Sequence, residues 1–116
     1  MKLAIFVLAT LAAVALSVNT AQEAHIIPGQ VAVVTFSNIS LIYNSPKDWF
    51  LALTAPWCGH CMKLMPELLM LAETMNDTPD IVIAKANADA EVALQLQFNM
   101  AAFPTIYFIS AHSGEV

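Results

Sequence analysis

The stretch that decides the fold is Trp57-Cys58-Gly59-His60-Cys61, in which two residues separate two cysteines. If a helix begins here, Cys58 lies at its N-terminus, where unpaired backbone N–H groups and the helix dipole favour a thiolate. Cys61 then lies one turn deeper, where it can attack a mixed disulfide formed on Cys58. His60, as a cation, would further stabilise the reduced thiolate. The spacing therefore predicts a redox pair that tends to donate its disulfide.

Two other interpretations of the pair stay open. A C-x-x-C pair is half of a four-ligand zinc site, but a second pair is absent, and His25 and His112 are remote in sequence. A purely structural disulfide would close a loop of only a few residues, which removes little entropy from the unfolded chain. We expect no metal and no organic cofactor.

Hydrophobic patterns on both sides of the motif predict alternating strands and helices. Apolar residues recur at three- and four-residue spacing from Cys58 to Met75, which is typical of a helix. Pro66 interrupts this pattern and should kink the helix. Ser37 is a candidate N-cap for a short helix. The other predicted elements are that helix at 38–44, strands at 31–36, 49–54, 81–86 and 105–110, and a second short helix at 91–98. The alternation indicates an α/β domain with a central sheet.

Composition excludes several classes of protein. The chain has 116 residues, 59% of them hydrophobic and 11% charged, which fits one folded domain and not a disordered chain. Four basic residues against nine acidic ones, with no basic cluster, argue against a nucleic-acid partner. Two cysteines are too few for a disulfide-rich miniprotein.

The N-terminus is typical of a secretory signal peptide. Lys2 precedes an uncharged apolar run from Leu3 to Val18, which is shorter than the ~20 residues of a membrane span. We expect a signal peptide over 1–21, cleaved after Ala21 or alternatively after Ser17, then a linker over 22–30 and a folded domain over 31–116. An uncleaved membrane anchor and a buried core helix are the other interpretations.

The string Ala55-Pro56-Trp57-Cys58-Gly59-His60-Cys61 resembles the active-site motif of catalytic domains of the protein disulfide isomerase family, which have a thioredoxin-like fold. Pro66-Glu67 and Phe103-Pro104-Thr105 also match these domains. The resemblance implies a central mixed sheet flanked by helices. It also implies that Cys58 is the nucleophile and Cys61 the resolving thiol of a thiol–disulfide oxidoreductase and isomerase.

The resemblance also implies roles for residues around the pair. Trp57, Gly59, His60 and Lys85 would modulate the active site, although Trp57 also fits simple core packing. Phe103 and a cis Pro104 would bind an extended substrate segment, although a trans proline at a strand start is also possible. His60, where thioredoxins have proline, places the chain with the more oxidising, isomerase-type sites, whose potentials lie ~90 mV above that of thioredoxin.

Three features depart from the family pattern. The buried acidic residue that such domains carry before the active site is replaced by Ala52, so Lys85 lacks its usual partner. A side chain that simply reaches solvent is the other interpretation of Lys85. Met62 follows Cys61 where a lysine is usual. We expect Met62, Met65, Met70 and Met75 to pack the helix rather than line a binding groove. Finally, the family's last strand and helix would fall beyond Val116, which indicates a fragment or a marginal fold.

These observations predict a protein of the endoplasmic reticulum lumen or secretory pathway. Its partners would be cysteine-containing client proteins and an upstream thiol oxidase, with a membrane contact only if the signal segment is uncleaved or a missing C-terminal segment spans it. Asn38-Ile39-Ser40 and Asn76-Asp77-Thr78 are candidate glycosylation sites. The alternative is a redox-slow client-binding or adaptor module, or a non-functional fragment.

Overall fold

The computed structural model describes residues 26–111. The expected signal peptide at 1–21, its alternatives and part of the expected linker lie outside the described residues. Within the described range, no helix is long and apolar enough to cross a membrane.

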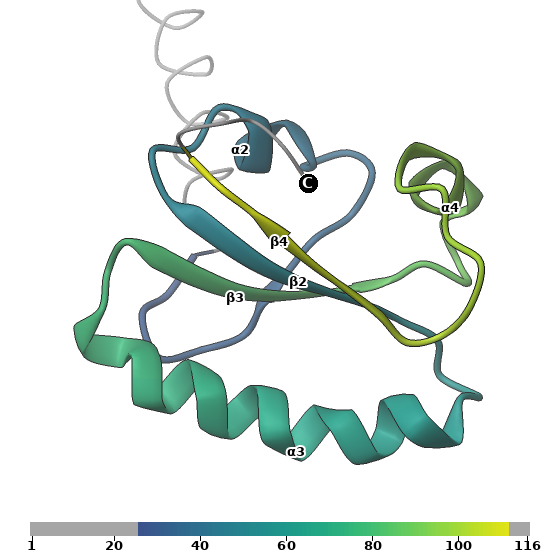
Figure 1. Cartoon of the computed structure of the whole chain (residues 1–116), viewed down its shortest axis with the longest axis horizontal. Helices are drawn as coiled ribbons and strands as arrows, with labels where there is room; N and C mark the ends of the chain where they lie inside the picture. The colour runs from purple at the N-terminus through teal and green to yellow at the C-terminus, as the bar shows by residue number, and fades with distance from the viewer. Residues whose placement is uncertain (1–25, 112–116) are drawn as a thin grey trace, which may run out of the picture.

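The fold is a four-stranded mixed sheet with helices on both faces (Figure 1). The strand order is β1-β3-β2-β4; β1, β3 and β2 are parallel, and β4 is antiparallel to β2. This confirms the expected thioredoxin-like sheet. The elements are β1 (Ala32–Val33), α2 (Ser40–Tyr43), β2 (Asp48–Thr54), α3 (Gly59–Thr74), η1 (Met75–Asp77), β3 (Ile81–Asn87), α4 (Val92–Gln97) and β4 (Thr105–Ile109).

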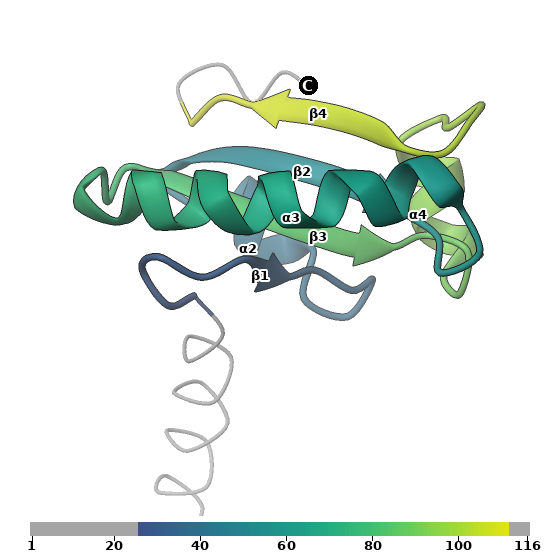
Figure 2. The same ribbon diagram turned by 90° about the horizontal axis from the view of Figure 1, so that it is seen from below.

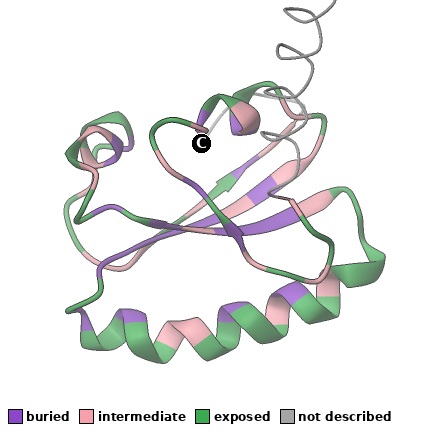
Figure 3. Cartoon of the chain, turned by 180° about the vertical axis from the view of Figure 1, so that it is seen from behind, coloured by how far each residue is buried: buried purple, intermediate pink, exposed green. Residues whose placement is uncertain are grey.

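Strand β2 lies between two apolar clusters, one on each face of the sheet. Trp49, Leu51 and Leu53 pack into the larger cluster together with residues of α2 and α4. Ala52 points to the other face and packs on Leu68 and the rest of the smaller cluster. The central strands are accordingly the most buried part of the fold (Figure 3). Because side chains alternate along a strand, an almost wholly apolar run is what a strand covered on both faces requires.

Helix α3 covers only part of its face of the sheet. It lies over β2 and β3, while β4 runs to one side of it (Figure 2). Ile106 and Phe108 of β4 pair with Ala52 and Phe50 of β2, so they belong to the α3 face, and both are exposed. The outer edge of β4 pairs with no strand among residues 26–111.

Two local predictions were wrong. The strand expected at 31–36 is only Ala32–Val33, and the helix expected from Ser37 begins at Ser40. The cause is the Asn38 side chain, whose Oδ1 accepts from the Thr35 N–H at 2.8 Å while its Nδ2 donates to the Val33 carbonyl at 3.1 Å. A side chain that binds the backbone in this way starts a turn and ends the strand.

Helix α3 continues through Pro66 without a break. The methionine prediction was half correct. Met65 and Met75 pack against the smaller cluster, whereas Met62 and Met70 are exposed. The helical spacing alone does not distinguish these pairs, because the exposed part of the α3 surface is set by how much of the sheet lies beneath it.

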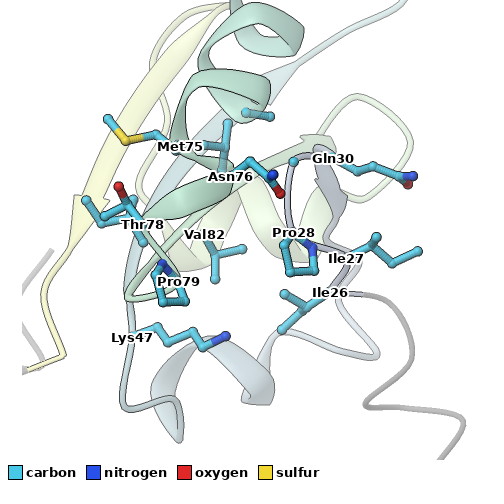
Figure 4. A pocket seen from close by; sticks show the side chains of 14 residues that line it. Ile26, Ile27, Pro28, Gln30, Lys47, Met75, Asn76, Thr78, Pro79 and Val82 are labelled. Atoms are coloured by element: carbon cyan, nitrogen blue, oxygen red, sulfur yellow. The ribbon is translucent and has the colours of Figure 1, made fainter.

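The residues before β1 pack against the turn that follows α3. Ile26, Pro28, Met75 and Pro79 surround a small pocket of about 30 Å³ (Figure 4). Gly29 in this segment has a φ of +81°, and a Cβ placed on it would lie 2.9 Å from Asn76 Oδ1. Both the backbone angle and the space therefore favour glycine here.

The core predicts a contrast between two leucines. Leu51→Ala, at a position with 0% exposure, should lower the free energy of unfolding by about 2–5 kcal/mol because it leaves a cavity between sheet and helices. Leu96→Ala, at a position with 77% exposure on α4, is the matched control and should change it by about 0.5 kcal/mol or less. Urea unfolding curves measure both, and equal effects would contradict the assigned core.

Alanine substitutions at Gly29 and Gly59 should have different effects on stability. Gly29→Ala should lower the free energy of unfolding by about 1–2 kcal/mol, because alanine disfavours positive φ. Gly59→Ala is the control: it lies in the first turn of α3 with nothing within 4 Å of the new Cβ, and alanine favours a helix. Calorimetry on both variants tests this, and a stabilised Gly29→Ala protein would refute the positive φ.

Candidate active site

Cys58 is the N-cap of α3. Its backbone is extended, with φ −82° and ψ 117°, and its carbonyl accepts the first helical hydrogen bond from the Met62 N–H at 3.1 Å. Its own N–H donates to the carbonyl of Ala55 at 3.2 Å, in the tight turn that follows β2. The buried strand therefore fixes where the helix starts, and with it the position of the Cys58 sulfur.

The Cys58 sulfur takes the place of the usual capping oxygen. Cys58 Sγ accepts a hydrogen bond from the Cys61 N–H at 3.2 Å. The pKa of the Cys58 thiol is lowered, first by a hydrogen bond from the Cys61 side chain and further by the backbone N–H groups of Cys61 and His60. Burial opposes this effect, since only 6% of Cys58 is exposed, but it is the smaller influence.

Cys61 has the opposite tendency. Burial raises the pKa of its thiol, and the side chain of Cys58 raises it further, both as hydrogen-bond acceptor and as a nearby negative charge. Both residues are free cysteines in the structure, and Cys61 is only 2% exposed. The pair therefore holds one thiol that ionises more readily than an ordinary cysteine beside one that ionises less readily.

An aromatic wall flanks Cys58. Phe103 packs against the cluster of Ala55, Cys58 and Cys61. The ring of Trp57 meets that of Phe103 edge-on, with centroids 5.4 Å apart and planes at 77°. Trp57 is 63% exposed, so core packing is the wrong interpretation of this residue. The Phe103–Pro104 peptide bond is cis, as the resemblance implies.

His60 and Gly59 are both exposed at the start of α3. His60 lowers the pKa of Cys58 through its backbone hydrogen bond. Gly59 meets no steric limit, so the fold itself does not require glycine there.

Lys85 lies on the Cys61 side of the site. It is the register partner of Ala52, so the two side chains share the α3 face of the sheet. Lys85 is half-buried and lines, with Cys61, a cavity of about 250 Å³. Ala52 is fully buried among apolar side chains and offers no acceptor.

The two glycosylation candidates differ in their surroundings. Asn38 is half-buried and its amide is engaged in the turn described above, whereas Asn76 is exposed in η1. Both lie away from the cysteines in sequence. Among residues 26–111, no group of three or more His, Cys, Asp or Glu side chains is placed to hold a metal ion.

The sequence did not reveal the cavity beside Cys61. Thr54, Met65 and Asn87 line it together with Cys61 and Lys85, and they come from β2, α3 and β3. The ends of two parallel strands bring Thr54 and Asn87 into register. The one sequence signal for this cavity was that Thr54 ends one predicted strand and Asn87 directly follows another, and this signal becomes useful only once the order of the strands in the sheet is known.

Comparison with known proteins identifies the domain. The sequence profile of the Thioredoxin family matches residues 30–115. The chain belongs to the thioredoxin family. The first thioredoxin domain of mouse protein disulfide-isomerase A4 superposes with a TM-score of 0.64 at 31% identity, over 73% of this chain and 61% of that one. Thioredoxin f from spinach chloroplast gives a TM-score of 0.66 at 23% identity, which shows the shared fold alone.

The sequence relatives of this thioredoxin domain are protein disulfide isomerases, which confirms the resemblance. The protein named protein disulfide isomerase-like 1-1 of Arabidopsis thaliana is 44% identical over 84 residues, covering 72% of this chain and 17% of that protein. Protein disulfide-isomerase A3 of Gallus gallus is 42% identical over 84 residues, covering 72% and 16%. The chain therefore spans about one sixth of the length of these relatives.

Substitutions of Cys61 test whether its side-chain hydrogen bond lowers the pKa of Cys58. Cys61→Ala removes the side-chain donor to Cys58, so the pKa of Cys58 should rise toward the ordinary thiol value. Cys61→Ser keeps an O–H donor and the backbone N–H, so Cys58 should stay more acidic than in Cys61→Ala. Thiolate absorbance against pH measures both, and identical titrations would show that the side-chain hydrogen bond is irrelevant.

The lowered pKa of Cys58 also predicts how the stability of the folded protein changes with pH. The pKa of Cys58 is lower in the folded state than in the unfolded chain. Its contribution to stability is therefore fully present above the unfolded thiol pKa and is lost as pH falls through the folded pKa. Between these two values, Cys61→Ser should gain stability with rising pH more steeply than Cys61→Ala.

Proposed function

We propose that this chain is a thiol–disulfide oxidoreductase and isomerase that acts on cysteines of other proteins. The observation that carries the proposal is the divided pair: Cys58, the N-cap of α3, has a lowered pKa, while that of buried Cys61 is raised. A nucleophile that ionises more readily than an ordinary thiol, beside a partner thiol that ionises less readily, is the arrangement that disulfide exchange requires.

Oxidation of a client proceeds through a mixed disulfide. A client thiolate attacks Cys58 Sγ of the Cys58–Cys61 disulfide, so a client–Cys58 bond forms and Cys61 leaves as a thiolate that takes up a proton. A second client thiolate then attacks the client sulfur of that bond, and Cys58 leaves as the thiolate stabilised by its cap. The client is oxidised by two electrons and the pair is reduced.

Isomerisation uses the reduced pair. The Cys58 thiolate attacks a client disulfide and releases one client sulfur, which can then attack a different disulfide of the same client. If the client does not rearrange, Cys61 loses its proton and attacks Cys58 Sγ, releasing the client in reduced form and closing the Cys58–Cys61 bond. Burial of Cys61 makes this release slow enough for rearrangement to compete.

The surroundings support a protein client. Trp57 and Phe103 offer exposed and half-exposed aromatic surface beside Cys58, and Pro104 follows at the start of β4. We assign them to the binding of an extended client segment. His60, as a cation, would favour the reduced pair. We assign His60, Gly59 and Lys85 to the residues that modulate the active site.

We place this activity in the secretory pathway, in the lumen of the endoplasmic reticulum. The basic, then apolar, start of the sequence supports a signal peptide over 1–21 that is followed by a linker over 22–30 and the domain over 31–116. An upstream thiol oxidase would reoxidise the pair. Of the two candidate glycosylation sites, exposed Asn76 is favoured over Asn38, whose amide is engaged.

A client-binding or adaptor module with slow redox chemistry is the second candidate. Ala52 favours it, because among residues 26–111 no carboxyl group lines the cavity that Lys85 and Cys61 share. The exposed Met62 and Met70 on α3 and Ile106 and Phe108 on β4 would supply apolar contact area.

Refolding of a small protein with scrambled disulfides separates the two functions. The wild-type chain should accelerate recovery of client activity, and Cys58→Ser should reduce the rate to that of buffer alone. Cys61→Ser, the same exchange one helical turn away, should retain attack but accumulate a mixed disulfide that is visible on non-reducing gels. Equal refolding rates for wild-type and Cys58→Ser proteins would refute the enzyme and favour the adaptor.

A further inference from the structure

Among residues 26–111, the lining of the cavity beside Cys61 contains one cation and no anion. Its nine lining residues come from the ends of β1, β2 and β3, the turn after β2 and the first turns of α3. Lys85 is the only charged residue among them; the others are Val33, Thr54, Ala55, Pro56, Cys61, Met62, Met65 and Asn87. The volume of about 250 Å³ is ample for a group of a few heavy atoms.

The Lys85 ammonium group lacks a partner in the described part of the chain. No hydrogen bond or ion pair joins its Nζ to residues 26–111. Its register partner Ala52 ends in a methyl group, and Ile83, two residues before it on the same face, is apolar as well. A cation that lines a cavity and has no counter-charge among the described residues attracts an anion to that cavity.

Cys61 needs a proton acceptor at the same place. To attack Cys58 Sγ in a mixed disulfide, the Cys61 thiol must first lose its proton. None of the other lining residues carries a carboxylate or an imidazole. The exposed His60 is not among the lining residues. As far as the described residues line it, the cavity therefore offers a proton donor, a cation and space, but no base.

We propose that this cavity is a binding site for a carboxylate group, which pairs with Lys85 and accepts the proton of Cys61. The proposal rests on the resolving role given to Cys61 above. The same chemistry can come from a small free carboxylate, such as acetate, or from an acidic side chain of the client.

The step balances without an oxidant or a reductant. The carboxylate takes the proton of the Cys61 thiol and becomes a carboxylic acid, while Cys61 becomes a thiolate. That thiolate attacks Cys58 Sγ, so the Cys58–Cys61 bond forms and the Cys58–client bond breaks. The departing client thiolate takes the proton, directly or through water, which restores the carboxylate.

The test isolates Cys61 from the rest of the cycle. In Cys58→Ser, iodoacetamide can alkylate only Cys61, since the chain has two cysteines. Alkylation is followed at constant pH and ionic strength while acetate replaces chloride. Lys85→Met keeps an unbranched side chain of similar length, shorter by one atom, without the charge, and is the matched control. Acetate should accelerate alkylation by about tenfold, with half-saturation at about 10–100 mM, and Lys85→Met should abolish the saturable part.

Two results would overturn the proposal. One is no acceleration by acetate; the other is an acceleration that grows linearly and equally in Lys85→Met, which would mean proton transfer from bulk buffer. As a second readout, acetate should raise the melting temperature of Cys58→Ser relative to chloride, and this shift should vanish in Lys85→Met. Neither measurement uses a client, so loss of the proposed oxidoreductase activity would not change these results.

A second arm distinguishes the source of the carboxylate. Mixed disulfides are prepared on Cys58 of the otherwise wild-type chain with two short peptides, which carry Glu or Gln next to their cysteine. Faster release of the Glu peptide, lost in Lys85→Met, assigns the site to a client side chain. Equal release, with acceleration of both by acetate, assigns it to a free anion. Release that responds to neither carboxylate contradicts the site.

Discussion

The hydrogen bond from the Cys61 N–H to the Cys58 sulfur, at 3.2 Å, is the contact on which the site depends. It satisfies a backbone donor that every helix N-terminus leaves unpaired, and it does so with sulfur in place of the usual oxygen. The stability of α3 and the acidity of Cys58 are thereby linked, because the thiolate form of Cys58 is both the better cap of the helix and the form that attacks a disulfide. The one-turn spacing then places Cys61 in the interior, where its own charge is disfavoured.

The sheet turns this local contact into a fixed geometry. Strand β2 is packed on both faces, and the turn at Ala55 transmits its position directly to Cys58. On one side of the pair, Phe103 lies just before β4 and contacts the ring of Trp57; on the other side, β3 carries Lys85. The aromatic wall and the cavity therefore belong to different neighbours of the same strand, so a change on one side can leave the other in place.

Elements with a strong local pattern were predictable, and those set by long-range contacts were not. The apolar runs of β2 and β3 and the periodic face of α3 appeared within a residue or two of their observed bounds. The end of β1 depended on how the Asn38 side chain folds back on Thr35, which no periodicity encodes. Likewise the motif located Cys58 and Cys61, but exposure of Met62 and the cavity at Lys85 follow from how far α3 overlies the sheet.

The two tryptophans sit in opposite surroundings, and this gives the molecule two separate optical signals. Trp49 is 2% exposed within the larger core cluster, and Trp57 is 63% exposed next to Cys58. Emission from the first reports whether the polypeptide has collapsed around its centre. Emission from the second reports events at the sulfur beside it, since a disulfide quenches a nearby indole. Replacing either ring by phenylalanine therefore leaves a fluorescent probe of unfolding or of electron transfer, without an added label.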